Sequence, residues 1–261
     1  MNQQAFYTIQ EQSTPFIAVA LHDGHSIEHT LKRFLLLDEQ GRSREEDPYT
    51  WYMIEHLPIT KVRVHASRFQ TDLNRVKDKA IYQTPEDAWG LEVWNNIPAE
   101  LIDKLYNNYD VFYEAMYELI DKTIALHGFA VVLDVHTYNH RRDSPDEQSP
   151  DSTHPEINLG TAYNSEKWRK LFTKYTNFIS GYNMMNQTPD ARENIIFKGG
   201  GFAQQIIKRY GDKCGVLSIE FKKTFMDEWT GVAAIEHIME IKKLLSASLE
   251  FLQSEIKTVV N

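Results

Sequence analysis

The chain has 261 residues, of which 42% are hydrophobic, 25% charged and 12% aromatic, which is enough for one well-buried domain of the larger kind. This composition excludes intrinsic disorder and a collagen-like fibre, and the single cysteine, Cys214, excludes a disulfide scaffold. The formal net charge of -9 argues against nucleic acid or an anionic membrane surface as a partner.

Short apolar runs alternate along the chain with longer segments of helical periodicity. Strands are predicted at residues 16–21, 62–64, 129–133, 195–197 and 216–219. Most of these runs are almost continuously apolar, so both faces of their sheet should be covered, as in a mostly parallel sheet flanked by helices. Without a linker or an internal repeat, we expect one domain over residues 1–261.

Helices are predicted between the strands. Ser26 can cap a helix that runs to about residue 37, another follows Asp47 and Pro48, and the longest covers 98–126 and ends at Gly128. Three more are predicted at 168–179, 203–210 and 234–256. The alternation predicts an α/β fold, a three-layer sandwich with a mixed, mostly parallel central sheet.

The segment 139–159 interrupts this alternation. It contains three prolines among polar residues, so it cannot form a continuous helix or a central strand. Because it directly follows the carboxyl end of a predicted strand, we interpret it as a functional loop. A solvated excursion without a role is the alternative.

Polar side chains gather just after three of the strands. His22 follows the first strand, Asp134 and His136 end the third, and Glu220 ends the last. Zinc takes about four nitrogen or oxygen ligands, drawn from several chain segments, and a catalytic site leaves one position open. His22 and His136 are therefore candidate zinc ligands, and Asp134 can hold an imidazole from behind. The residues leave the third ligand open among His25, Glu45, Glu46 and Asp47.

Two further segments offer groups that bind anions. Arg68 and Arg75, helped by the amide of Asn74, can grip a carboxylate, although ion pairs with the many acidic residues are the alternative. Lys198 precedes three glycines whose backbone N–H groups can meet an oxyanion, although this pattern also fits a plain turn between a strand and a helix.

Glu220 lies inside an apolar strand, where a bare carboxylate is costly to bury. It is therefore our candidate for the general base that takes a proton from water. An ion pair with Lys222 or Lys223 is the alternative. The pattern of a serine nucleophile is absent, and Cys214 has no activating neighbour in the sequence.

Several of these segments, in order and spacing, resemble the N-formylglutamate amidohydrolases over about residues 15–230. The resemblance is carried by His22-x-Gly24, Ser67-Arg68-Phe69, Asp72-Leu73-Asn74-Arg75, Asp134-x-His136-Thr137, Asn158-Leu159-Gly160-Thr161, Phe197-Lys198-Gly199-Gly200, and Glu220 followed by Met226-Asp227-Glu228. That family is similar in turn to zinc carboxypeptidases and aspartoacylases, which implies a mixed eight-stranded sheet between helices. The sequence departs from the pattern in two places: His25 stands where those relatives have glutamate, and Leu21 where typical formylglutamate enzymes have proline.

The resemblance implies a zinc-dependent amidohydrolase that cleaves N-formyl-L-glutamate or a similar small N-acyl amino acid, as in histidine degradation. It implies that one Zn²⁺ per chain is held by His22 and His136 with His25 or Asp47, and that Glu220 activates water. Arg68 or Lys198 would stabilise the oxyanion. Substrate-binding residues would be Arg68, Asn74, Arg75, Lys198 and Arg141, with Arg142 as a further anion contact.

Two alternatives to this function remain: a carboxypeptidase-like peptide hydrolase, and a non-catalytic module that binds acyl amino acids. No apolar run approaches the roughly 20 residues of a membrane helix, and the first residues lack the pattern of a secretion signal. We therefore expect a cytoplasmic protein that binds neither membranes nor nucleic acid. The sequence does not predict an oligomeric state.

Overall fold

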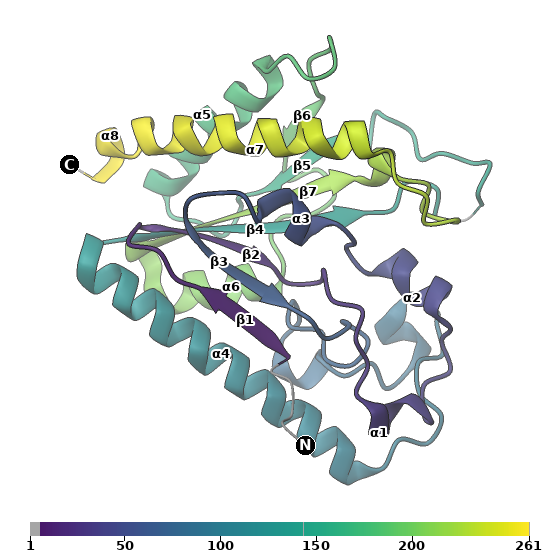
Figure 1. Ribbon diagram of the computed structural model, residues 1–261. Coiled ribbons are helices and arrows are strands. Elements are labelled where there is room, and N and C mark those ends of the chain that lie inside the picture. Colours follow the sequence, from purple (N-terminus) through teal and green to yellow (C-terminus); the bar gives the residue numbers. More distant parts are fainter. Residues whose placement is uncertain (1–5, 143, 261) are drawn as a thin grey trace.

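The fold is built around a mixed seven-stranded sheet, seen in a computed structural model that describes residues 6–142 and 144–260 (Figure 1). The strands are β1 (Tyr7–Gln10), β2 (Phe16–Ala20), β3 (Thr60–Val64), β4 (Ala130–Tyr138), β5 (Ile157–Gly160), β6 (Ala191–Glu193) and β7 (Cys214–Lys222), and their order in the sheet is β1-β3-β2-β4-β7-β5-β6. Strands β3, β2, β4 and β7 are parallel, whereas β1 and β5 run antiparallel to β3 and β7. The described residues thus form seven strands rather than the eight that the resemblance implied.

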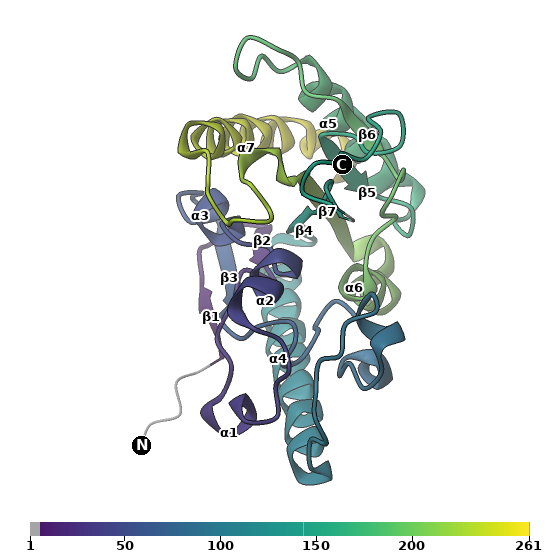
Figure 2. The ribbon, with the colours of Figure 1, turned by 90° about the vertical axis from the view of Figure 1, so that its right-hand side faces the viewer.

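Helices cover both faces of the sheet and complete the predicted three layers. The helices are α1 (His29–Lys32), α2 (Glu39–Glu45), α3 (Thr50–Ile54), α4 (Ala99–His127), α5 (Glu166–Gly181), α6 (Gly201–Tyr210), α7 (Ile235–Glu255) and α8 (Lys257–Val260). Figure 2 shows α5 and α7 on one side of the sheet and α4 on the other. The α/β fold predicted from the sequence is confirmed.

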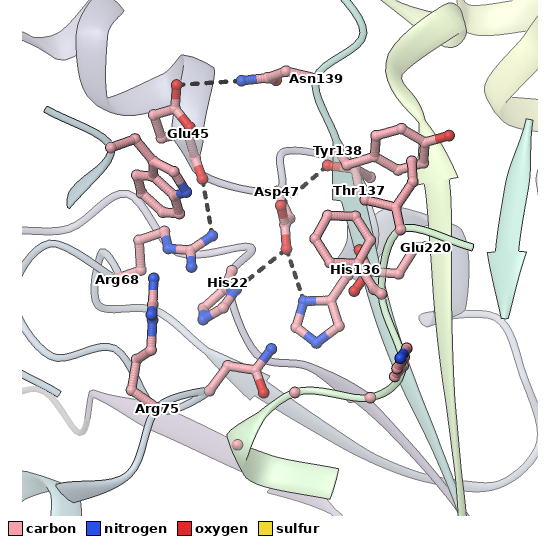
Figure 3. A pocket seen from close by; sticks show the side chains of 18 of the residues that line it. His22, Glu45, Asp47, Arg68, Arg75, His136, Thr137, Tyr138, Asn139 and Glu220 are labelled. Carbon is pink, nitrogen blue, oxygen red and sulfur yellow. Dashed lines mark hydrogen bonds and ion pairs between the residues drawn. The ribbon is translucent and has the colours of Figure 1, made fainter. Parts of the chain in front are cut away.

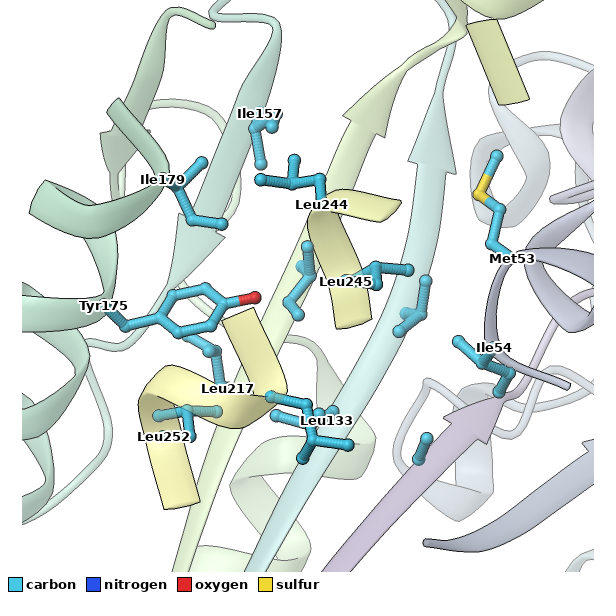
Figure 4. Packing of buried hydrophobic residues seen from close by; sticks show 14 of the residues in the cluster. Met53, Ile54, Leu133, Ile157, Tyr175, Ile179, Leu217, Leu244, Leu245 and Leu252 are labelled. Atoms are coloured by element: carbon cyan, nitrogen blue, oxygen red, sulfur yellow. The ribbon is translucent and has the colours of Figure 1, made fainter. Parts of the chain in front are cut away.

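Two apolar clusters join the layers. On one face, Leu133 of β4 and Leu217 of β7 pack against Leu244 and Leu252 of α7 and Tyr175 of α5 (Figure 4). On the other face, alternate residues of the same strands pack against α4 and α6. Burying each such side chain stabilises the fold by roughly 1.5–3 kcal/mol. The strands are therefore covered on both faces, as their continuous apolar runs predicted.

Four of the five predicted strands are present, as β2, β3, β4 and β7. The prediction at 195–197 is wrong, because strand β6 ends at Glu193 and Asn194 takes a left-handed conformation with φ 58°. The N–H groups of Ile195 and Ile196 then donate to the side chain of Asn158 rather than to a neighbouring strand. Strand β5 begins inside the predicted loop 139–159 and ends just beyond it at Gly160, and the short strand β1 gave no pattern long enough to predict.

The helix at 98–126 is confirmed as α4, which ends at Gly128 with φ 81°. The prediction at 26–37 is wrong, since only His29–Lys32 is helical. Ser26 instead bridges to Ala66, and Leu35 bridges to Trp94, so both ends of the predicted helix are drawn into extended pairings. No helix within the described ranges is long and apolar enough to cross a membrane.

The sheet brings three strand ends to one edge. Strands β2, β4 and β7 are neighbours and parallel, so their carboxyl ends point the same way. His136 on β4 stands directly opposite Glu220 on β7. The residues that follow β2 reach the same edge, which is where the candidate site lies.

Candidate active site and metal centre

A pocket of about 590 Å³ opens at the carboxyl ends of β2, β4 and β7 (Figure 3). Its lining includes His22, which follows β2, together with His136 of β4 and Glu220 of β7. Asp47 enters from the segment after α2, because its backbone N–H donates to the carbonyl of His22 at 3.0 Å. Four side chains from distant parts of the sequence thus face one cavity.

Three buried side chains form a compact cluster at the base of this pocket. Oδ2 of Asp47 lies 2.9 Å from Nδ1 of His136 and 3.3 Å from Nδ1 of His22. One ligand atom from each of the three residues lies within 4.8 Å of the others. Two imidazole nitrogens and one carboxylate oxygen are a donor set that suits zinc.

A second pair of carboxylates orients the two imidazole rings from behind. Nε2 of His22 lies 2.8 Å from Oδ1 of Asp72, and Nε2 of His136 lies 2.8 Å from Oδ1 of Asp134, as the sequence predicted for Asp134. Both contacts turn Nδ1 toward Asp47, which is how metal-binding histidines are commonly held. Within the described residues, the buried Nδ1 of His22 makes no well-directed hydrogen bond. The cluster therefore fits a divalent metal ion.

The charges of the cluster are strongly coupled. Burial raises the pKa of Asp47, but the hydrogen bond from His136 and the nearby imidazole of His22 outweigh it and hold the pKa below its usual range. Burial lowers the pKa of His136, but Asp134 and Glu220 outweigh it and raise the pKa well above that of free imidazole. In the metal-free state, the protonated imidazole of His136 therefore lies between the carboxylates of Asp47 and Asp134. The proton on Nδ1 would have to leave before Nδ1 could bind a metal.

Glu220 is a buried carboxyl beside this cluster. Loss of hydration, with smaller contributions from Asp47 and Asp134, raises its pKa to about 8. The two lysines that follow are engaged elsewhere: Nζ of Lys222 lies 2.8 Å from Oδ1 of Asp151, and Nζ of Lys223 donates to two backbone carbonyls. The predicted alternative, an ion pair between Glu220 and one of these lysines, is absent among the described residues.

Basic side chains form one wall of the pocket. Arg68 donates to Oδ2 of Asp72 at 2.8 Å, and its guanidinium lies 4.8 Å from the ring centre of Trp89. Nε of Arg75 lies 3.6 Å from the same carboxylate oxygen, and this side chain is 40% exposed. Arg142 also lies over Trp89 and pairs with Glu45. Asp72 thus ties the basic wall to His22.

A family model described as N-formylglutamate amidohydrolase matches residues 14–226 of this sequence. The chain belongs to the N-formylglutamate amidohydrolase family. It is therefore an amidohydrolase, an enzyme that hydrolyses an amide bond. A search of curated proteins found no match.

Two solved structures share the fold of this member of the N-formylglutamate amidohydrolase family. The N-formylglutamate amidohydrolase from Ralstonia eutropha JMP134 is 16% identical, with a TM-score of 0.76 over 98% of this chain and 100% of that one. A gene product from Agrobacterium tumefaciens is also 16% identical, with a TM-score of 0.63 over 92% of this chain and 95% of that one. A metallo-carboxypeptidase from Pseudomonas aeruginosa is 10% identical, with a TM-score of 0.39 over 94% of this chain and 57% of that one.

In this member of the N-formylglutamate amidohydrolase family, His25 does not reach the cluster of His22, Asp47 and His136. Its Nδ1 contacts Glu46 and its Nε2 lies 3.1 Å from Arg42, and its side chain is 41% exposed. Glu46 faces away from the cluster, toward His25 and Ser67. Among the four candidates for the third ligand, Asp47 is the one that the structure places beside both imidazoles.

Arg141 likewise lies outside this pocket, contrary to the role in substrate binding expected for it. Its guanidinium pairs with Asp227 at 3.1 Å, and its backbone N–H donates to Glu228. The next residue, Arg142, lines the pocket instead. The chain turns at this point because the Glu228 carboxylate accepts the N–H groups of both His140 and Arg141.

The glycines after Lys198 are explained by close packing. A Cβ on Gly200 would lie 2.1 Å from Oδ1 of Asn74, and one on Gly201 would lie 2.6 Å from the Asn74 carbonyl oxygen. Lys198 and Asn74 both line the pocket. Glycine at these positions lets the loop lie against the segment that carries Asn74 and Arg75 without displacing the Asn74 side chain or backbone.

Sequence reasoning missed three further residues of the pocket. Trp89 lies under the basic wall, with φ 53°. Tyr138 and Phe197 line the opposite side. Tyr138 stands two positions after His136 and so shares its face of β4, which is a signal that the sequence already contained.

Proposed function

We propose that this protein is a zinc-dependent hydrolase of N-acyl amino acids, with N-formyl-L-glutamate or a close analogue as substrate. One observation supports the proposal most strongly. The buried imidazoles of His22 and His136 and the buried carboxylate of Asp47 lie close enough to bind one ion, beside Glu220 in a pocket with a basic wall. A cytoplasmic location and a part in histidine degradation stay predictions.

His22, Asp47 and His136 would hold the zinc ion, with Asp72 and Asp134 orienting the imidazoles. When bound, zinc polarises an amide carbonyl and lowers the pKa of water toward neutrality. This is the chemistry that hydrolysis of an unreactive amide requires.

Glu220 is the proposed general base. Its carboxyl is buried next to the cluster, and in the metal-free protein loss of hydration raises its pKa to about 8. The positive charge of a bound metal ion would lower that pKa and favour the carboxylate, which is the form that accepts a proton. In the proposed reaction, Glu220 accepts a proton from the attacking water and then delivers it to the nitrogen of the leaving amino acid.

Arg75 and Asn74 are proposed to bind the carboxylate of the substrate. The Arg75 guanidinium lies over the rings of Tyr82 and Trp89. Among the described residues its one polar contact is the ion pair with Asp72, so most of its N–H groups are available to a ligand. Arg68 is more constrained, since Tyr82, Glu45 and Asp72 each accept one of its hydrogen bonds. A fixed guanidinium is suited to the oxyanion, because it need not reorganise as charge develops. Lys198 is the third cation of the pocket that we propose contacts substrate.

The test is hydrolysis of N-formyl-L-glutamate and other N-acyl-L-amino acids by the zinc-loaded protein, followed by release of the free amino acid. Glu220→Gln is expected to lower kcat by roughly 10²–10⁴-fold with unchanged zinc content. Glu250→Gln, an exposed residue on α7, is the matched control and should retain the full rate.

Three outcomes would contradict this proposal. Full activity of the Glu220→Gln variant would show that Glu220 is not the general base. Tight binding of N-acyl amino acids without turnover at saturating zinc would instead indicate a binding module, and turnover of peptides alone would indicate a peptide hydrolase.

A further inference from the structure

We infer that, among N-acyl amino acids, this pocket prefers those with an apolar acyl group larger than formyl, and that Tyr138 and Phe197 form the wall that binds this group. This inference rests on the proposed hydrolysis of N-acyl amino acids and specifies the substrate class of the same pocket. The inference concerns the acyl group of the substrate, which lies on the side of the scissile amide opposite the basic wall.

The metal cluster lies between a basic end and an aromatic end of the pocket. Figure 3 shows Arg68 and Arg75 on one side of the cluster, and Tyr138 and Glu220 on the other. Asp72 links Arg68 to His22, so the basic end belongs to the side of β2. An amide carbonyl held at the cluster directs one substituent to each end. With the amino acid carboxylate at the arginines, the acyl group faces Tyr138.

Phe197 is anchored to the aromatic end by Asn158. Asn158 lies on β5 directly opposite Glu220 of β7. Its side-chain Nδ2 donates to the carbonyl of Phe197 at 2.8 Å, and its Oδ1 accepts from Ile195 and Ile196 at 3.0 Å. The buried amide of Asn158 therefore fixes the backbone of Phe197 beside the proposed general base.

The two rings form a preorganised apolar wall. Tyr138 and Phe197 have ring centres 5.6 Å apart with an angle of 65° between their planes, a favourable edge-to-face pair. The hydroxyl of Tyr138 donates to the carbonyl of Pro155, which holds its ring in place. Because the Tyr138 ring is held by its hydroxyl and the Phe197 backbone is held by Asn158, the wall loses little conformational entropy when a ligand binds.

The exposure of this wall points to what covers it. Phe197 is 37% exposed and lines the pocket. A formyl group places only a hydrogen atom beyond its carbonyl carbon and would leave this ring in water. A phenyl or branched alkyl group would bury it and gain the corresponding hydrophobic free energy. The pocket, at about 590 Å³, is within the size range of sites for drug-sized ligands.

The experiment compares N-formyl-, N-acetyl-, N-benzoyl- and N-succinyl-L-glutamate, which differ only in the acyl group. We expect the zinc-loaded protein to show a kcat/KM for the benzoyl compound about tenfold or more above that for the formyl compound. Calorimetric binding to Glu220→Gln should show the same order of affinity, and this measurement does not depend on turnover.

Variants of Phe197 locate the effect. Phe197→Ala should lower kcat/KM for the benzoyl compound about tenfold and leave the formyl compound within about twofold, and Phe197→Leu should restore part of the loss. Ile195→Ala is the matched control, because this neighbour is 45% exposed but does not line the pocket. It should change neither substrate.

The inference would be overturned if the formyl compound were bound and hydrolysed as well as the benzoyl one, or if Phe197→Ala weakened both equally. A preference for the succinyl compound would also overturn it, because Lys198 rather than the rings would then select the acyl group. If the benzoyl compound binds selectively but the wild type releases no glutamate from it, the proposed hydrolysis is wrong. The inference that Tyr138 and Phe197 bind the acyl group would still be supported.

Discussion

Replacing Glu220 by glutamine is expected to stabilise the metal-free protein, and the gain should grow as the pH rises. Loss of hydration, with Asp47 and Asp134, raises the pKa of Glu220 from its ordinary 4.5 to about 8 in the folded state. The unfolded chain therefore ionises first. The folded state has the full stability associated with the neutral carboxyl below pH 4.5 and loses it progressively as the pH rises toward 8.

The size of this effect follows from the two pKa values. At pH 7 the pH lies about 2.5 units above the ordinary pKa of glutamate and still below that of the folded state, so the penalty is about 3 kcal/mol at 1.36 kcal/mol per unit. Glutamine has nearly the same shape and no proton to lose. The free energy of unfolding of Glu220→Gln, relative to wild type, should thus rise by about 1.4 kcal/mol per pH unit between pH 5 and 7.

Urea unfolding of the chelator-treated proteins, followed by tryptophan fluorescence at several pH values, measures this difference. Glu250→Gln, on the exposed face of α7, should show no such slope. A difference between Glu220→Gln and wild type that is constant from pH 5 to 8 would refute the reasoning, because it would mean that Glu220 has an ordinary pKa in the folded protein.

Three further substitutions probe the support of the pocket. Asp72→Asn should lower the free energy of unfolding in urea by about 3–5 kcal/mol, because the buried Arg68 loses its charged partner at 2.8 Å; a loss below about 1 kcal/mol would contradict this. Gly200→Ala should raise KM for an N-acyl amino acid about tenfold at nearly unchanged stability, since the new Cβ would lie 2.1 Å from Oδ1 of Asn74 and displace that amide. Gly215→Ala should do the reverse, with an unchanged KM and a loss of about 1–3 kcal/mol, because its Cβ would lie 2.6 Å from the ring of the buried Trp168. A loss of stability in Gly200→Ala together with a raised KM in Gly215→Ala would contradict the packing described for both glycines.

Much of the pocket could be predicted because its residues follow apolar strands. His22, His136 and Glu220 each stand at the carboxyl end of a run that only a buried strand explains, and parallel strands bring such ends together. The predicted sheet therefore already placed these three side chains at one edge.

The choice of Asp47 over His25 could not be predicted from local pattern. It depends on a backbone hydrogen bond from Asp47 to His22 and on helix α2, whose sequence EQGRSRE has no apolar periodicity. His25 is closer to His22 along the chain, but Glu46 and Arg42 hold it elsewhere. Contacts between segments about twenty residues apart decided the arrangement.

The wrong strand at 195–197 has a similar origin. Its apolar residues have the composition of a strand, but the Asn158 side chain takes the N–H groups that a strand would give to a neighbour. Local propensity was overridden by a side chain that lies 37 positions earlier in the chain. The result is the loop that presents Phe197 to the pocket.

The most direct test of the metal centre is the zinc content of the purified wild type and of two matched variants, Asp47→Ala and His25→Ala. The wild type and His25→Ala should each hold about one zinc ion per chain, and Asp47→Ala should lose most of it. Loss of zinc from His25→Ala with retention by Asp47→Ala would contradict the proposed ligand set.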